Sequence, residues 1–370
     1  MTKLHTLYSE YGQSPWIDNI RRDWLNDGTL QSLVDQGVRG VTSNPSIFAK
    51  AFATSSAYDQ FLIGANVSDA EALFESLAAN DVRDACDVLS AVHEASRDDV
   101  ANGTRRYLDG FVSLEVSPRL ARDTQGTIAA AKRLAVDVGR QNLMIKIPAT
   151  KEGLPAVTEV LGAGINVNVT LIFSLERYDE VLTAWMAGLE LARQNGHDIR
   201  EIASVASFFV SRVDAAVDAL LEPGDPRRGT TANAQVCAAY ELYLYRISSD
   251  RAVDLLEGGA QVQRPLWAST STKNPTYHDL LYVDWIVGDE TVNTMPDATL
   301  EGVIDHGDFS RSLLLSVESI AAEANKLKAL PHEISLRAVT DQLETNGVDS
   351  FVTSYEEVLA TVREKIESSR

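Results

Sequence analysis

A single lysine lies in a stretch that otherwise has the composition of a buried strand. Lys146 stands between Ile145 and Ile147, and Pro148 ends the run. Burying a charged lysine is costly, so this residue either faces solvent on an edge strand, pairs with a carboxylate, or takes part in chemistry. Burial disfavours the ammonium form, and a neutral amine can attack a carbonyl group to form an imine. Schiff-base catalysis is therefore the chemistry that this stretch permits.

Two further stretches alternate polar and apolar residues with the period of a strand. Residues 112–116 place Ser113 and Glu115 on one face, and residues 165–171 do the same for Asn166, Asn168 and Thr170. Purely structural interpretations exist for both stretches. The face with Asn166, Asn168 and Thr170 could belong to an edge strand exposed to solvent on one side, and Glu115 could be a structural partner for Lys146 or an arginine. The functional interpretation is a polar site with a carboxylate for proton transfer.

The elements that must position these residues are short strands alternating with helices, the pattern of a parallel sheet with crossover helices. The sequence predicts eight strands, which is the number that a closed (β/α)₈ barrel requires. An open doubly wound sheet is the alternative. The expected strands are residues 16–20, 38–42, 110–116, 143–148, 165–173, 202–210, 265–269 and 292–295.

Helical periodicity fills the segments between the strands and beyond them. Asp123 or Thr124 and Ser174 are expected N-caps of two barrel helices. We expect one domain over residues 1–370, with a helical insertion at about 55–106 and a helical extension at about 311–370. Within the extension, Pro331 and Gly347 are predicted helix breakers.

Composition narrows the class of protein. The chain has 370 residues, 45% of them hydrophobic and 23% charged, which is typical of a folded globular protein. With 33 basic and 53 acidic residues the net charge is −20, which opposes binding to nucleic acid or to an anionic membrane. Two cysteines, the absence of a signal-peptide pattern and the lack of a long apolar run favour the cytoplasm. The histidines lack metal-ligand spacing, so we expect no metal.

Five motifs together resemble the transaldolase family, strand after strand and in order. The resemblance spans roughly residues 16–295, and the inserted helices are similar to those of the longer branch found in some bacteria. The motifs are GVTSNPS at 40–46, VSLEVS at 112–117, LMIKIP at 143–148, INVNVT at 165–170 and ASFFVSR at 206–212.

The resemblance implies a (β/α)₈ TIM barrel and a transferase that moves a dihydroxyacetone unit reversibly from sedoheptulose 7-phosphate to glyceraldehyde 3-phosphate in the pentose phosphate pathway. It implies that Lys146 forms the Schiff base with the C2 ketone and that Asp18 takes the proton of the C4 hydroxyl as the C3–C4 bond breaks. Glu115 and Thr170 would position a water that shuttles protons. No cofactor is implied, because the lysine itself is the electron sink.

The resemblance also implies which side chains hold the substrate. These are Thr42, Asn44, Asn168 and Ser207 for the three-carbon unit, and Arg212, Ser269, Ser271 and Lys273 for the phosphate. Many family members have Ser-Phe-Arg at the seventh strand, whereas this chain has Ser269-Thr-Ser271. The second phosphate-binding arginine is therefore absent, and Ser271 or Lys273 is expected to replace it.

Three functions remain open at this point: the transferase, a related lyase that releases dihydroxyacetone to water as fructose 6-phosphate aldolase does, and a non-catalytic sugar-phosphate sensor. The expected partners are small sugar phosphates, and the expected assembly is a monomer or homodimer.

Overall fold

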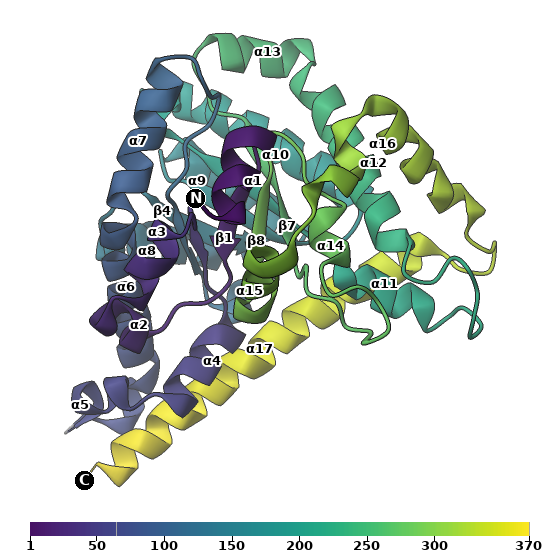
Figure 1. The fold of residues 1–370 in the computed structure, drawn as a ribbon. Coiled ribbons are helices and arrows are strands. Elements are labelled where there is room, and N and C mark those ends of the chain that lie inside the picture. Colours follow the sequence, from purple (N-terminus) through teal and green to yellow (C-terminus); the bar gives the residue numbers. More distant parts are fainter. Residues whose placement is uncertain (64, 370) are drawn as a thin grey trace.

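The strands close into a barrel (Figure 1). The computed structural model describes residues 1–63 and 65–369. All eight strands are parallel and follow chain order, and β1 closes the ring beside β8. This confirms the predicted (β/α)₈ fold and excludes the open sheet. The strands are β1 Ser14–Ile17, β2 Val41–Thr42, β3 Val112–Glu115, β4 Leu143–Pro148, β5 Val167–Ile172, β6 Ser204–Phe209, β7 Gln263–Ala268 and β8 Val292–Met295.

The observed strands agree with the predicted ones best in β4 and β8, whose bounds are those expected. β2 is shorter than predicted and begins only at Val41. The amide of Val38 donates to the carbonyl of Leu33 in the turn after the preceding helix, whereas Arg39 and Gly40 already bond to Pro15 and Ile17 of β1. β7 begins two residues earlier than expected, since Pro265 lies inside the strand opposite Ala206 rather than at its start.

Helices surround the barrel, and two of the predicted caps are present. The side chain of Asp123 accepts a hydrogen bond from the amide of Gly126, and that of Ser174 accepts one from Arg177. The helices are α1 Lys3–Tyr11, α2 Arg22–Asp27, α3 Thr29–Asp35, α4 Pro45–Thr54, α5 Asp59–Leu62, α6 Ala70–Val88, α7 Ser90–Ala101, α8 Thr124–Val138, α9 Gly153–Gly162, α10 Leu175–Gln194, α11 Ser211–Asp218, α12 Thr231–Ile247, α13 Asp250–Glu257, α14 Leu281–Asp284, α15 Asp297–His306, α16 Val317–Ala324 and α17 Leu336–Ser368. Short 3₁₀ turns lie at Ser56–Tyr58, Val67–Asp69, Pro118–Leu120, Ile199–Glu201, Phe309–Arg311, Leu313–Leu315 and Asn325–Ala329. None of the helices in the described ranges is both long and apolar enough to cross a membrane.

The last helix, α17, corrects one prediction. Gly347 was expected to break it, but α17 runs through this position without interruption. A Cβ atom at Gly347 would lie 3.1 Å from Leu171 Cδ2, so the glycine serves a close approach to β5 rather than a break. Figure 1 shows α17 passing obliquely along the end of the barrel where α4 and α11 begin.

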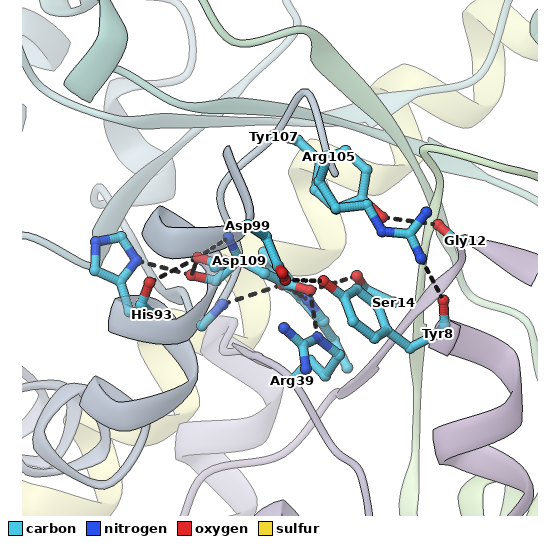
Figure 2. A network of polar contacts seen from close by, with 12 residues as sticks. Tyr8, Gly12, Ser14, Arg39, His93, Asp99, Arg105, Tyr107 and Asp109 are labelled. Carbon is cyan, nitrogen blue, oxygen red and sulfur yellow. Dashed lines mark hydrogen bonds and ion pairs between the residues drawn. The ribbon is translucent and has the colours of Figure 1, made fainter. Parts of the chain in front are cut away.

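The opposite end of the barrel is filled by a buried polar network (Figure 2). Asp109 is fully buried just before β3, and its carboxylate accepts hydrogen bonds from Ser14, from Trp16 Nε1 at 3.0 Å and from Arg39 Nε at 2.8 Å. Arg264 Nη1 lies 3.7 Å from the same carboxylate. Burial alone would raise the pKa of Asp109, but the two guanidinium groups hold it below its ordinary value. This end is closed, which leaves the carboxyl ends of the strands for chemistry.

Candidate active site

Strand register places three of the predicted residues in one row across the barrel interior. Glu115 on β3 pairs with Lys146 on β4, and Lys146 pairs with Asn168 on β5. Paired residues of parallel strands point to the same side of the sheet. The side chain of Lys146 is only 5% exposed and that of Glu115 only 3%. The alternation in the sequence therefore places a lysine and a carboxylate side by side inside the barrel.

The amine of Lys146 has few polar neighbours. Its Nζ donates to the carbonyl of Ser43 at 3.2 Å and lies 3.5 Å from Glu115 Oε2. Within the described residues neither oxygen of Glu115 makes a hydrogen bond, and Thr170 Oγ1 is likewise buried without one. Buried polar atoms are almost always satisfied, so these oxygens are available to a water or a ligand.

The carboxyl group of Glu115 is partly protonated near neutral pH. Burial raises the pKa of its carboxyl from 4.5 to about 7, even though the nearby Lys146 favours the charged form. A carboxyl with such a pKa can both donate and accept a proton at physiological pH, as a general acid–base group requires.

The raised pKa makes the stability of the wild type depend on pH. Between about 4.5 and 7 the folded state holds the Glu115 proton more tightly than the unfolded chain does, so stability falls as pH rises. We expect Glu115→Gln to remove this loss. The free energy of unfolding of the variant minus that of the wild type should therefore be higher at pH 8 than at pH 4, by up to about 3 kcal/mol. Urea denaturation at the two pH values measures this difference. Glu364→Gln, which replaces an exposed glutamate, should show no such trend; equal pH trends in both variants would contradict the raised pKa.

A cavity of about 260 Å³ opens above this row at the carboxyl ends of the strands. Nine of the twelve predicted site residues line it, whereas Glu115, Asn168 and Thr170 lie outside its lining. The lining residues are Asp18, Thr42, Asn44, Ser46, Lys146, Ser207, Phe209, Arg212, Ala268, Ser269, Ser271, Lys273, Thr294, Pro296 and Phe351.

Asp18 stands on the cavity wall directly after β1 and is only partly exposed. Thr42 Oγ1 donates to its Oδ1 at 2.6 Å, and Thr42 in turn lies 2.6 Å from the hydroxyl of Thr294. Burial raises the pKa of Asp18, with Lys146 and Thr42 acting in the opposite direction. A carboxylate with raised basicity that faces a cavity is suited to take a proton from a ligand hydroxyl.

The two asparagines are held in different ways. Asn168 is fully buried, and both ends of its amide are used: Nδ2 donates to Ser113 Oγ at 3.0 Å and Oδ1 accepts from Ser207 Oγ at 2.7 Å. Asn44 caps α4, since its Oδ1 accepts from the amide of Ile47 at 3.0 Å. Asn44 also lines the cavity, and its amide nitrogen makes no hydrogen bond within residues 1–63 and 65–369, so it can donate to a ligand there.

Two cations, Arg212 and Lys273, line the cavity. In the described part of the chain, Arg212 and Lys273 form no ion pair with a carboxylate, and Lys273 Nζ donates to Ser271 Oγ at 2.8 Å. Burial lowers the pKa of Arg212 despite the charge of Asp18, and burial followed by the charge of Arg212 lowers that of Lys273. Arg212 is partly buried and Lys273 is exposed at the cavity rim. Two cavity-lining cations without a carboxylate partner among the described residues, in a protein with a net charge of −20, indicate a local binding site for an anion.

Backbone strain accompanies the site residues. Leu171, which follows Thr170, has φ 61° at an irregularity in β5, and Ser269 has φ 56° directly after β7. A non-glycine residue in the left-handed region costs roughly 1 to 3 kcal/mol and is held there by the surrounding structure. Strain at these two positions is typical of functional sites.

Sequence reasoning missed several cavity residues. Phe209 follows Ser207 on the same face of β6, and Thr294 shares the inner face of β8, so strict alternation would have found both. Phe351 carried no such signal, because it lies on α17, far beyond the last strand. Ser43 was also missed, since it contributes its backbone carbonyl rather than its side chain.

Comparison with known proteins agrees with the family resemblance of the sequence motifs. The family model described as "Transaldolase/Fructose-6-phosphate aldolase" matches residues 15–362. A protein named "Transaldolase" from Thermobifida fusca is 48% identical over 97% of both chains. Another of that name from Saccharopolyspora erythraea is 46% identical over 98% of this chain and 97% of its own, and one from Mycolicibacterium smegmatis is 45% identical over 98% and 97%.

Proposed function

The chain belongs to the transaldolase/fructose-6-phosphate aldolase family and has transaldolase function, and from this premise we propose that Lys146 carries the transferred dihydroxyacetone unit as a Schiff base. One observation supports this most strongly: the Lys146 amine is buried at the floor of a cavity, 3.5 Å from a carboxyl group whose pKa is about 7. The donor is sedoheptulose 7-phosphate, the acceptor is glyceraldehyde 3-phosphate, and the products are erythrose 4-phosphate and fructose 6-phosphate.

In the first step Lys146 adds to the C2 ketone, and the resulting carbinolamine loses water. Glu115 and Thr170 hold the water that moves protons in this step. Their buried oxygens, which lack hydrogen-bond partners within the described residues, support the assignment. The raised pKa of Glu115 supports it as well, because the group must donate and accept in turn.

In the second step Asp18 takes the proton of the C4 hydroxyl, the C3–C4 bond breaks, and the aldose phosphate leaves. The enamine of dihydroxyacetone remains on Lys146. Four side chains hold or position the hydroxyl groups of the three-carbon unit: Asn44, Asn168, Ser207 and Thr42. The hydrogen bond from Ser207 to Asn168 and the one from Thr42 to Asp18 support these roles. The enamine then adds to the acceptor aldehyde and the steps run in reverse.

The substrate phosphate binds between Arg212 and Lys273, with Ser269 and Ser271 as additional donors. The unpaired cations support this placement, and the Lys273–Ser271 hydrogen bond supports Lys273 as the replacement for the arginine that many family members have at the seventh strand. A lysine grips phosphate as a point charge, so Arg212 carries the bidentate contact.

Trapping with borohydride tests the chemistry, because reduction fixes an imine on its lysine. With fructose 6-phosphate, the wild type is expected to yield a three-carbon adduct on Lys146. Asp18→Asn is expected to lower turnover by roughly 10² to 10⁴-fold and to yield the six-carbon phosphorylated adduct instead, because the imine forms but the C3–C4 bond stays intact. Intact-mass spectrometry and peptide mapping distinguish the two adducts. An adduct on another lysine, or none on active wild type, would overturn the Schiff-base assignment.

We further propose a cytoplasmic location, a monomer or homodimer, and one domain over residues 1–370. The packing of the C-terminal helix α17 against α4, α6 and α11 supports the single domain. Size-exclusion chromatography with light scattering measures the assembly directly.

A further inference from the structure

One wall of the cavity comes from outside the barrel. Phe351 on α17 lines the cavity and is 3% exposed, and the centre of its ring lies 5.8 Å from Lys146 Nζ. The barrel contributes polar groups to the same cavity, among them Asp18, Thr42 and Asn44. Phe351 is therefore an apolar surface directly beside the reacting nitrogen.

The helix that carries Phe351 is fixed over the barrel mouth on both sides of this residue. Toward its N-terminus, Gly347 brings α17 close to Leu171 of β5, and Glu344 forms an ion pair with Arg177 at 3.2 Å. Three residues beyond Phe351, the hydroxyl of Ser354 lies 2.8 Å from that of Ser46, which itself lines the cavity. The ring is held in place rather than resting on a mobile tail.

The position of the ring matters because the enamine on Lys146 has two fates. It can add through C3 to an acceptor aldehyde, which is transfer. Alternatively, water protonates C3 to give an iminium ion, the hydroxide left behind adds to C2, and the carbinolamine collapses to release dihydroxyacetone and the free Lys146 amine. The second route needs a water that reaches C3 of the enamine, and an apolar ring that lines the cavity beside Lys146 takes the space of such a water.

We propose that Phe351 is a specificity-determining residue that shields the Lys146-bound enamine from water and so favours transfer over release. The inference rests on the proposed role of Lys146 and goes beyond it, because it assigns the balance between transferase and lyase to a residue of the C-terminal helix. Shrinking the ring opens space for water beside the enamine without removing any polar group of the site.

A graded series tests the proposal: Phe351→Leu, Phe351→Val and Phe351→Ala. Each variant is given fructose 6-phosphate, and free dihydroxyacetone is measured without acceptor, whereas transfer is measured with erythrose 4-phosphate. The ratio of release to transfer is expected to stay within about twofold of wild type for leucine and to rise to about tenfold or more for alanine, with valine between them. The graded series keeps the test decisive even if the alanine variant fails to fold.

Val358→Ala is the matched control, because Val358 is fully buried on the same helix but does not line the cavity. It loosens the packing of α17 without opening the space beside Lys146. A ratio that stays at the Val358→Ala level in all Phe351 variants would overturn the proposal. Borohydride trapping separates the two claims: absence of an adduct on wild-type Lys146 refutes the Schiff base, whereas normal adducts with an unchanged ratio refute only the shielding role of Phe351.

Discussion

Lys146→Met is expected to lower the rate of three-carbon transfer by roughly 10⁴-fold or more, since it removes the amine that carries the proposed covalent intermediate. The side chain of Lys146 is 5% exposed, and among the residues that the structure describes its amine has two polar partners at short range, the Ser43 carbonyl and the Glu115 carboxyl. Methionine fills a similar volume and cannot form an imine. A coupled assay that follows glyceraldehyde 3-phosphate measures the loss.

The same variant should fold at least as well as the wild type. Removing one partner of a buried ion pair is usually costly because the other charge is left alone. Here the remaining partner is Glu115, whose pKa is about 7 even with Lys146 present, so it can become neutral by taking up a proton. We therefore expect a melting temperature equal to or above that of the wild type, by calorimetry at pH 6.

Lys151→Met serves as the control, because Lys151 is exposed on the loop after β4. It should retain activity. If Lys146→Met retained more than about a hundredth of wild-type turnover, the covalent mechanism would be wrong. If it were unfolded, the lysine would have a structural role that the buried pair does not explain.

Much of the barrel and of the polar row could be predicted because both follow from the two-residue period of strands. Lys146 and Glu115 were found by alternation alone, and register then brought them together on neighbouring strands. The caps Asp123 and Ser174 were found because their side chains satisfy amides at the start of a helix. These rules depend on neighbouring residues only, so they can be applied to the sequence directly.

Tertiary relations were harder to predict. Gly347 looks like a helix breaker by propensity, but the close approach of α17 to Leu171 decides its role. Phe351 belongs to an amphipathic helix whose apolar face predicts burial but not what it covers. Asn168 was correctly placed on the inner face, yet only the structure shows that Ser113 and Ser207 occupy its amide below the cavity.

Asp109→Ala is expected to lower the free energy of unfolding by about 3 to 5 kcal/mol, the cost of leaving buried charges without their partner. Arg39 and Arg264 both lie against this carboxylate, and Arg264 is itself 2% exposed. Ser14 and Trp16 lose an acceptor at the same time. Urea denaturation measures the change, and Asp254→Ala, which removes an exposed pair with Arg193, should cost only about 0 to 1 kcal/mol.

The pKa of Asp109 fixes the sign of its pH dependence. Because the folded pKa lies below its ordinary value of 3.8, the stabilisation is fully present above that value and is lost as pH falls through the folded pKa. The difference between wild type and Asp109→Ala should therefore be constant from pH 5 to 8 and shrink in acid. A difference that instead shrank on raising the pH would contradict the arrangement in Figure 2.

The effects of Asp109→Ala and Lys146→Met are expected to differ because the two residues lie at opposite ends of the barrel. Asp109 precedes β3 at the closed end, whereas Lys146 faces the cavity at the carboxyl ends of the strands. Below its unfolding temperature, Asp109→Ala should transfer the three-carbon unit at close to the wild-type rate, while Lys146→Met should be folded and inactive. Parallel barrels place their chemistry at one end, so stability at the other end can be lost without touching the catalytic groups. A loss of turnover in folded Asp109→Ala would show instead that the buried network positions the site through the strands.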